Sequence, residues 1–147
     1  QSSSLFLLEL ILAILFFSLA SAVCVQFFVK SHLMSRNARN LNYAVNECSA
    51  VAELVTASDG IEDACSLILT LYEEAQIAET YPPNIRIDYD ETFAPCRAGE
   101  GTYILLTSFT EKDQMLTANI SMKETAPDSL VYELTVKHHL QRRPANE

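Results

Sequence analysis

The feature that most constrains this chain is a long apolar segment near its N-terminus. The segment runs from Leu5 to Val29, reads LFLLELILAILFFSLASAVCVQFFV, and has Glu9 as its only charged residue. As an α-helix rising about 1.5 Å per residue, it is longer than the ~30 Å hydrocarbon core of a bilayer. The sequence therefore predicts a transmembrane segment over residues 1–29 that ties the rest of the chain to membrane lipid.

The remaining chain is long enough for one small domain. Of the 147 residues, those after Val29 are too few for two cores of ordinary size. The formal net charge is −9. Nucleic-acid binding needs clustered Lys and Arg, so nucleic acid is not predicted as a partner. We expect a domain over residues 30–140 and a flexible polar tail over 141–147.

The orientation of the membrane segment rests on the charges beside it. Lys30, Arg36 and Arg39 follow the apolar segment directly, and no acid occurs until Glu47. The positive-inside rule places such bases in the cytoplasm unless a basic leader precedes the helix. The given sequence starts at Gln1, and removal of a basic leader would resolve this conflict. We expect a single-pass protein of the cell membrane whose C-terminal domain is extracytoplasmic.

A second interpretation of the N-terminus is a secretory signal. Ala20-Ser21-Ala22 has the small-x-small form of a cleavage site, and cleavage after Ala22 would release a secreted domain. Apolar residues continue from Val23 to Val29, which favours a membrane anchor over a signal that is removed. Both interpretations remain open from the residues alone.

Two helices are predicted after the apolar segment. Residues 30–57 contain neither Pro nor Gly, and their apolar positions recur at helical spacing, namely Leu41, Ala44, Val45, Cys48, Ala52 and Val55. If continuous with the anchor, this helix would be ~80 Å long. Gly60 ends it. A second amphipathic helix is predicted over 61–78, because Pro82 and Pro83 cannot continue a helix.

The hydrophobic period changes to two after these prolines, which indicates β-strands over residues 85–140. The clearest alternation places Leu116, Ala118, Ile120 and Met122 on one face. Short turns between the strands predict an antiparallel meander of roughly four strands. The predicted fold class is α+β, with a long N-terminal helix and a second helix packed on this sheet.

The cysteines allow at most one disulfide outside the membrane segment. Cys24 lies within the apolar segment, which leaves Cys48, Cys65 and Cys96. Cys48 and Cys65 lie on the predicted core faces of consecutive helices, so we predict that these two pair if any disulfide forms. A reducing setting would leave all of them as thiols.

The sequence offers no convincing catalytic cluster. His138 and His139 are adjacent on a predicted strand, so their side chains point to opposite faces. Asp88, Asp90 and Glu91 form a weak calcium candidate, because their oxygens suit this ion but no ligand-loop spacing follows. We therefore predict that the protein is not an enzyme and that it needs no cofactor.

Glu9 is the one residue of the apolar segment that calls for an explanation. A carboxylate at the centre of a membrane helix costs roughly 2.5–3.5 kcal/mol on insertion scales and less toward an end. One interpretation places Glu9 at the membrane interface, where it reaches water or headgroups. The other pairs Glu9 with a positive group of a neighbouring identical helix, such as a free α-amino terminus, which would make the helix an assembly surface.

The N-terminal residues also carry a family resemblance. Leu5-Phe6-Leu7-Leu8-Glu9-Leu10-Ile11, followed by an apolar run and a long amphipathic helix, resembles the start of type IV pilins and of type II secretion pseudopilins. Members of that family have a glutamate as the fifth residue of the mature chain. If Leu5 is the first mature residue, Glu9 takes that place.

The resemblance implies a structural subunit of a pilus-like or pseudopilus-like filament, anchored in the membrane before assembly. It implies that Leu5, Phe6 and Glu9 act in assembly, and that the partners are related subunits, a prepilin peptidase and an assembly machinery. The chain departs from the family in having Ser4 before Leu5, Leu5 in place of phenylalanine, and no proline in the apolar run. These departures predict a divergent or minor subunit.

The alternative that the residues support is a single-pass anchor presenting a small binding or sensory domain. In that case Glu9 would be dispensable.

Overall fold

The structure is a computed structural model that describes residues 2–78 and 80–141. The chain divides into two compact units, Gln1–Arg39 and Asn40–Glu147. The predicted membrane segment, residues 1–29, lies wholly within the first unit. Residues 30–39 belong to the same unit, and all of their side chains are exposed. The flexible tail predicted for 141–147 lies, apart from Gln141, outside the described residues.

Helix α1 (Ser2–Thr56) is a single element that belongs to both units. No Pro or Gly interrupts it, and it ends one residue before the predicted position. At its end the Ser58 hydroxyl donates to the Val55 carbonyl oxygen over 2.6 Å. This bond satisfies one of the carbonyls that a helix end leaves without a partner.

The second unit buries one face of the last turns of α1. Its buried residues are Ala44, Cys48, Val51, Ala52 and Val55. Four of these belong to the predicted apolar stripe. Val51 was missed, and Leu41 of the predicted stripe remains 44% exposed. The helical period was thus correct, and the buried face overlaps most of the predicted stripe.

Helix α2 (Ile61–Leu71) is shorter than the predicted 61–78. Tyr72 has an extended backbone, and Gln76–Ile77 forms a short strand, β1, paired with Ile85 and Arg86. Glu73 and Glu74 follow the last helical residue, where the negative end of the helix dipole disfavours acids. Strand pairing gives the backbone of residues 76–77 the partners that a longer helix would have provided.

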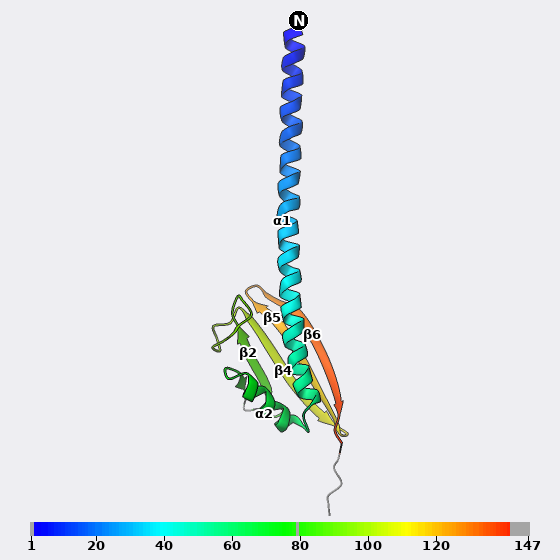
Figure 1. Cartoon of the computed structure of the whole chain (residues 1–147), viewed down its shortest axis with the longest axis vertical. Helices are drawn as coiled ribbons and strands as arrows, with labels where there is room; N and C mark the ends of the chain where they lie inside the picture. The colour runs from blue at the N-terminus through cyan, green and yellow to red at the C-terminus, as the bar shows by residue number, and fades with distance from the viewer. Residues whose placement is uncertain (1, 79, 142–147) are drawn as a thin grey trace, which may run out of the picture. The chain divides into compact units, whose positions relative to one another are not determined.

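The sheet has six antiparallel strands rather than roughly four. Figure 1 shows its long strands β2, β4, β5 and β6. Its order is β1-β2-β4-β5-β6, and β3 pairs with β2. The four long strands match the predicted meander, and the two extra strands have only two residues each. The strand bounds after β1 are β2 Asn84–Tyr89, β3 Pro95–Cys96, β4 Tyr103–Lys112, β5 Met115–Thr125 and β6 Asp128–His139.

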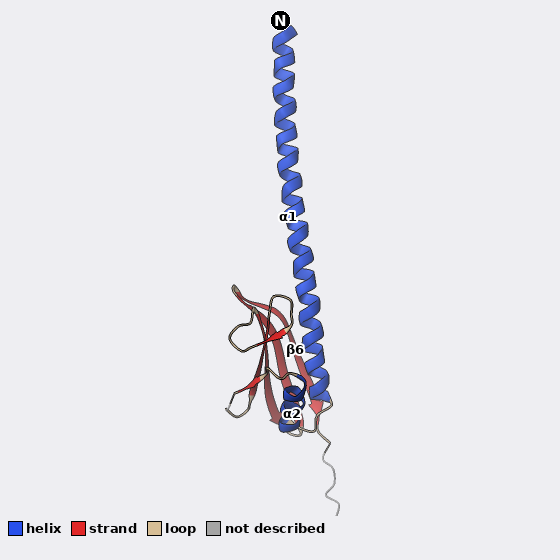
Figure 2. Ribbon diagram, turned by 60° about the vertical axis from the view of Figure 1, so that its left-hand side comes forward, coloured by secondary structure: helices blue, strands red, loops and turns tan. Residues whose placement is uncertain are grey.

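The core lies on the helix-bearing side of this sheet (Figure 2). In β5 every second residue is buried, and these are the four residues that the alternation predicted, Leu116, Ala118, Ile120 and Met122. They join Ile61, Ala64, Cys65 and Ile68 of α2 and the buried face of α1 in one cluster. The α+β fold class is confirmed.

Candidate functional sites in the apolar helix and the domain

The apolar part of α1 exposes large side chains on every face. Leu5 is 68% exposed and Phe6 is 66% exposed, and no residue from 2 to 39 is buried. The helix is long and apolar enough to cross a membrane. Seventeen large apolar side chains between Leu5 and Val29 are exposed. Full burial of one such side chain is worth about 1.5–3 kcal/mol, so covering them all is worth tens of kcal/mol.

Glu9 lies on this apolar surface, one turn after Leu5. Residues four apart share a helix face, so Leu5 and Glu9 project from the same side. Glu9 is exposed, and no ion pair reaches it within the part of the chain that the structure describes. The three residues predicted to act in assembly therefore form one short, uncovered surface at the start of α1.

The carboxylate of Glu47 links α1 to the rest of the domain through hydrogen bonds with two tyrosines. Oε2 of Glu47 accepts hydrogen bonds from the hydroxyls of Tyr72 (3.2 Å) and Tyr89 (3.0 Å). Tyr89 is fully buried in β2, and Tyr72 follows the last residue of α2. Burial, and then the charge of Glu47, raise the pKa of Tyr72 to about 12 and raise that of Tyr89 further. Both phenols therefore stay protonated and donate at physiological pH.

This cluster was missed by the sequence analysis. Its members are separated by 25 and 42 residues, so no local motif links them. The one available signal was chemical, because a buried tyrosine usually finds a partner for its hydroxyl.

All four cysteines are free thiols in the structure. Cys48 and Cys65 are buried, as their predicted core positions required. Burial, and then the neighbouring charge of Glu47, raise the pKa of Cys48 to about 12. Burial, followed by the charge of Glu62, also raises the pKa of Cys65. Their pairing under oxidising conditions stays a prediction.

We predict that Cys48 and Cys65 of the folded protein resist alkylation at pH 7.5. Reaction needs an accessible thiolate, and burial disfavours it at both positions. The measurement is iodoacetamide labelling with peptide mass mapping, first in the native state and then in urea. Cys24, which is exposed, is the control, and with the protein in detergent it should be labelled in the native state. Rapid native labelling of Cys48 would contradict this prediction, whereas a mapped Cys65–Cys96 disulfide would contradict the predicted pairing of Cys48 with Cys65.

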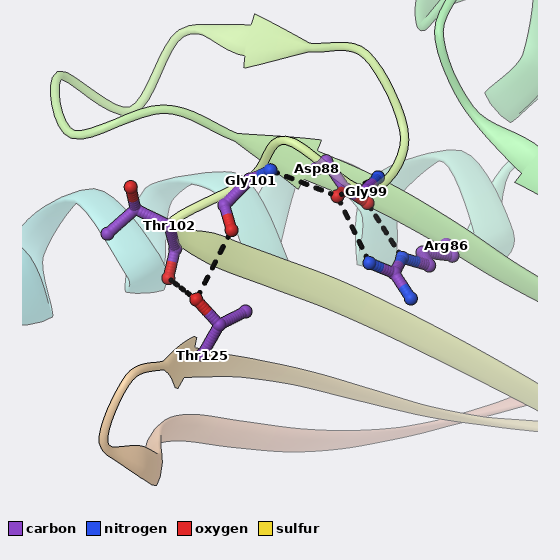
Figure 3. A network of polar contacts seen from close by, with 6 residues as sticks. All are labelled: Arg86, Asp88, Gly99, Gly101, Thr102 and Thr125. Carbon is purple, nitrogen blue, oxygen red and sulfur yellow. Dashed lines mark hydrogen bonds and ion pairs between the residues drawn. The ribbon is translucent and has the colours of Figure 1, made fainter.

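Asp88 is a buried structural carboxylate (Figure 3). Its side chain is 1% exposed, and Arg86 contacts it through Nε–Oδ1 (2.8 Å) and Nη2–Oδ2 (3.1 Å). The backbone N–H groups of Gly99 (2.9 Å) and Gly101 (3.3 Å) also donate to Oδ2. Burial alone would raise the pKa of Asp88, but the bonds from Arg86, Gly99 and Gly101 outweigh burial and lower it.

The loop before β4 approaches Asp88 too closely for a larger residue at position 101. A Cβ atom added to Gly101 would lie 2.8 Å from Cβ of Asp88. Glycine therefore allows the backbone N–H of residue 101 to reach the carboxylate.

The calcium candidate does not assemble into a site. Asp88 is occupied by the four bonds just described, and Asp90 lies beyond the end of β2. Oδ1 of Asp90 accepts from the Thr92 hydroxyl (2.6 Å) and from the backbone N–H groups of Ala94 (3.1 Å) and Thr92 (2.8 Å), and these bonds lower the pKa of Asp90. Glu91 is exposed. Among the described residues, no group of three His, Cys, Asp or Glu side chains is placed to hold a metal ion.

A groove of about 660 Å³ runs beside α2. Apolar side chains from α2, β1 and the following loop line much of it, including Ile61, Leu69, Ile77 and Pro83. Glu62 and Cys65 add a carboxylate and a thiol. An apolar lining with a few polar groups suits a small apolar ligand.

Comparison of the chain with models of protein families, with curated proteins and with solved structures gives no match. The architecture itself combines a long N-terminal apolar helix with an antiparallel sheet. In these general terms the architecture is pilin-like.

Proposed function

We propose that the protein is a structural subunit of a type IV pilus-like or type II secretion pseudopilus-like filament. The observation that carries this proposal is the composition of α1. One unbroken helix contains an apolar segment exposed on all faces, a single acid near its start, and the stripe that forms the domain core.

The apolar segment needs a cover in every state of the protein. Its combined burial is worth far more than the 5–15 kcal/mol that stabilises a typical domain, so exposure to water is not a stable alternative. In the proposed function, lipid covers the segment before assembly and the helices of neighbouring subunits cover it afterwards. Lipid and packed apolar helices both suit a helix segment that is apolar on all faces.

In the proposed assembly, Glu9 sets the axial position of each subunit relative to its neighbour. An unpaired carboxylate among packed apolar helices carries a desolvation penalty, whereas a partner cation at one position removes much of it. We propose that the α-amino terminus of an adjacent subunit supplies this cation. Mismatched axial positions would leave Glu9 without its partner and are therefore disfavoured.

The experiment that tests this function is cell fractionation followed by shearing. We expect an epitope-tagged full chain to resist carbonate extraction from membranes, and a part of it to appear in filaments sheared from the cell surface. Immunogold labelling should place the tag along these filaments. A chain found only in membranes would contradict the filament function.

The second candidate function is a membrane-anchored binding domain, which the groove beside α2 favours. This function predicts that the chain stays in the membrane after shearing and that Glu9 can be replaced without effect. Cleavage after Ala22 is distinguished by the mass of the mature N-terminal peptide, because it would remove Glu9 altogether.

A further inference from the structure

A basic segment of α1 follows its apolar segment. Lys30, Arg36 and Arg39 carry the charge of this segment, and no acid lies within residues 30–39. The basic segment continues the apolar helix without a break (Figure 1). Its side chains are exposed, and no ion pair reaches the three bases within the part of the chain that the structure describes. Their charges are therefore open to an anionic partner outside this chain.

The charges of the chain are unevenly distributed along the sequence. Residues 1–39 contain three bases and one acid, whereas residues 40–147 contain seven bases and 18 acids. The two parts thus have net charges of +2 and −11, which together give the −9 of the chain. An anionic membrane surface repels an acidic domain. Attraction to such a surface can therefore act through the bases that directly follow the apolar segment.

The bases begin where a membrane-spanning helix would leave the hydrocarbon core. The twenty residues from Leu10 to Val29 are uncharged, and as a helix they measure about 30 Å, the thickness of that core. If these residues fill the core, Lys30 begins the headgroup layer, and Arg36 lies about 9 Å farther along the helix. The side chains of a helix tilt toward its N-terminus, which here is toward the membrane. A long arginine side chain can therefore reach back to the headgroups.

Helical spacing gathers most of these side chains on one face. His32, Arg36 and Arg39 follow one another at spacings of four and three residues, so they share a face, which we call the basic face. Phe28 lies one turn before His32 on the same face, within the apolar segment. Lys30 lies two residues from both Phe28 and His32, about 200° around the helix, and therefore projects from the other side.

We propose that the basic face binds the phosphate headgroups of anionic phospholipids and enriches these lipids on its side of α1. A guanidinium can donate two parallel hydrogen bonds to one phosphate. In phosphatidylcholine the choline cation compensates the phosphate charge, whereas phosphatidylglycerol has no such cation. This selectivity requires α1 to be inserted in a membrane, as in the proposed function, but it does not require a filament. Its failure would therefore leave the filament function to its own test.

The position of the basic face favours lipid over protein as its partner. The acidic domain of a second copy could also supply negative charge, but only when two copies meet. Bases that directly follow a membrane segment lie at the headgroups in every inserted copy. The attraction of each base to an anionic surface acts within a Debye length, about 8 Å at physiological ionic strength. Arginine side chains that reach back toward the membrane come within that distance.

The test uses a single tryptophan beneath the basic face. The chain contains no tryptophan, so Phe28→Trp introduces a unique fluorophore among the lipid chains on this side of the helix. The full chain is reconstituted at one copy per nanodisc in equal parts of phosphatidylcholine and phosphatidylglycerol. Bromine, which quenches indole at short range, is carried by the acyl chains of phosphatidylglycerol in one sample and of phosphatidylcholine in the other. Because the headgroup composition is identical, a difference in quenching measures which lipid lies beside residue 28.

We expect brominated phosphatidylglycerol to quench the introduced tryptophan several-fold more strongly than brominated phosphatidylcholine. Replacing both Arg36 and Arg39 by glutamine should make the two samples equal. High salt screens exposed charges and should reduce the difference in the protein that keeps both arginines. Equal quenching in that protein at low salt would overturn the proposal.

Lys30→Gln is the matched control for Arg36→Gln. Both changes remove one positive charge from the same segment, but Lys30 lies on the other side of the helix. We expect Arg36→Gln to lower the preference for phosphatidylglycerol beside residue 28 and Lys30→Gln to leave it unchanged. An equal loss in both variants would show that total charge selects the lipid, and would overturn a role for the basic face.

A second measurement tests the protein partner directly. Nanodiscs of phosphatidylcholine alone, large enough for two copies, contain no anionic lipid. We expect association of the copies in these discs to be the same with and without the double replacement of Arg36 and Arg39. If the replacement abolishes association there, the basic face binds the acidic domain of a second copy and the lipid proposal is wrong.

Discussion

Replacing Glu9 by alanine is expected to reduce incorporation into filaments to background while leaving the domain folded. The domain should survive because its core is built entirely from residues after Asn40, and Glu9 belongs to the other unit. Assembly should fail because the carboxylate that pairs with the neighbouring amine is lost. The measurement is the amount of tagged chain in the sheared filament fraction, relative to the amount in the membrane.

Membrane insertion cannot explain such a loss. Removing a carboxylate from an apolar helix lowers the cost of insertion by up to roughly 2.5–3.5 kcal/mol, so the membrane level of Glu9→Ala should equal or exceed that of the wild type. Glu9→Gln, which keeps the shape but not the charge, should fail as alanine does. The matched control is Glu53→Ala, an exposed glutamate on the same helix. Normal filaments from Glu9→Ala would rule out the assembly mechanism.

Elements with a strong local signal were predicted correctly. The end of α1 follows from the lack of Pro and Gly up to Gly60, and the buried face of β5 follows from a period of two over Leu116 to Met122. In each case neighbouring residues alone decide the structure.

Elements that depend on distant partners were missed. The end of α2 depends on residues 76–77 pairing with β2, and the burial of Asp88 depends on the loop that contains Gly99, eleven residues later. The sequence does not show which distant backbone groups approach Asp88. Within the candidate sites, Glu9 could be identified because charge is rare in an apolar helix. The link from Glu47 to Tyr72 and Tyr89 required the fold.

The largest loss of stability is expected from Asp88→Ala. This change leaves the N–H groups of Gly99 and Gly101 without their acceptor and frees Arg86. Each buried group that loses its partner costs about 1–3 kcal/mol, so we expect the free energy of unfolding to fall by about 3 kcal/mol. Urea unfolding can be followed by tyrosine fluorescence, because all six tyrosines belong to the second unit. Glu91→Ala, an exposed neighbour, should change stability by less than about 0.5 kcal/mol.

The pH dependence of a second variant, Asp88→Asn, distinguishes a contribution from the charge of Asp88 from a contribution of its packing alone. The pKa of Asp88 is lowered in the folded state, so its ionised form stabilises the fold above the unfolded value of about 3.9. That contribution is lost as the pH falls through the lower folded pKa. The stability difference between wild type and Asp88→Asn should therefore be constant above about pH 5 and shrink below about pH 4. Asp90, whose pKa is also lowered, is present in both proteins and cancels. A difference that stays constant down to pH 2 would show that the charge of Asp88 contributes nothing.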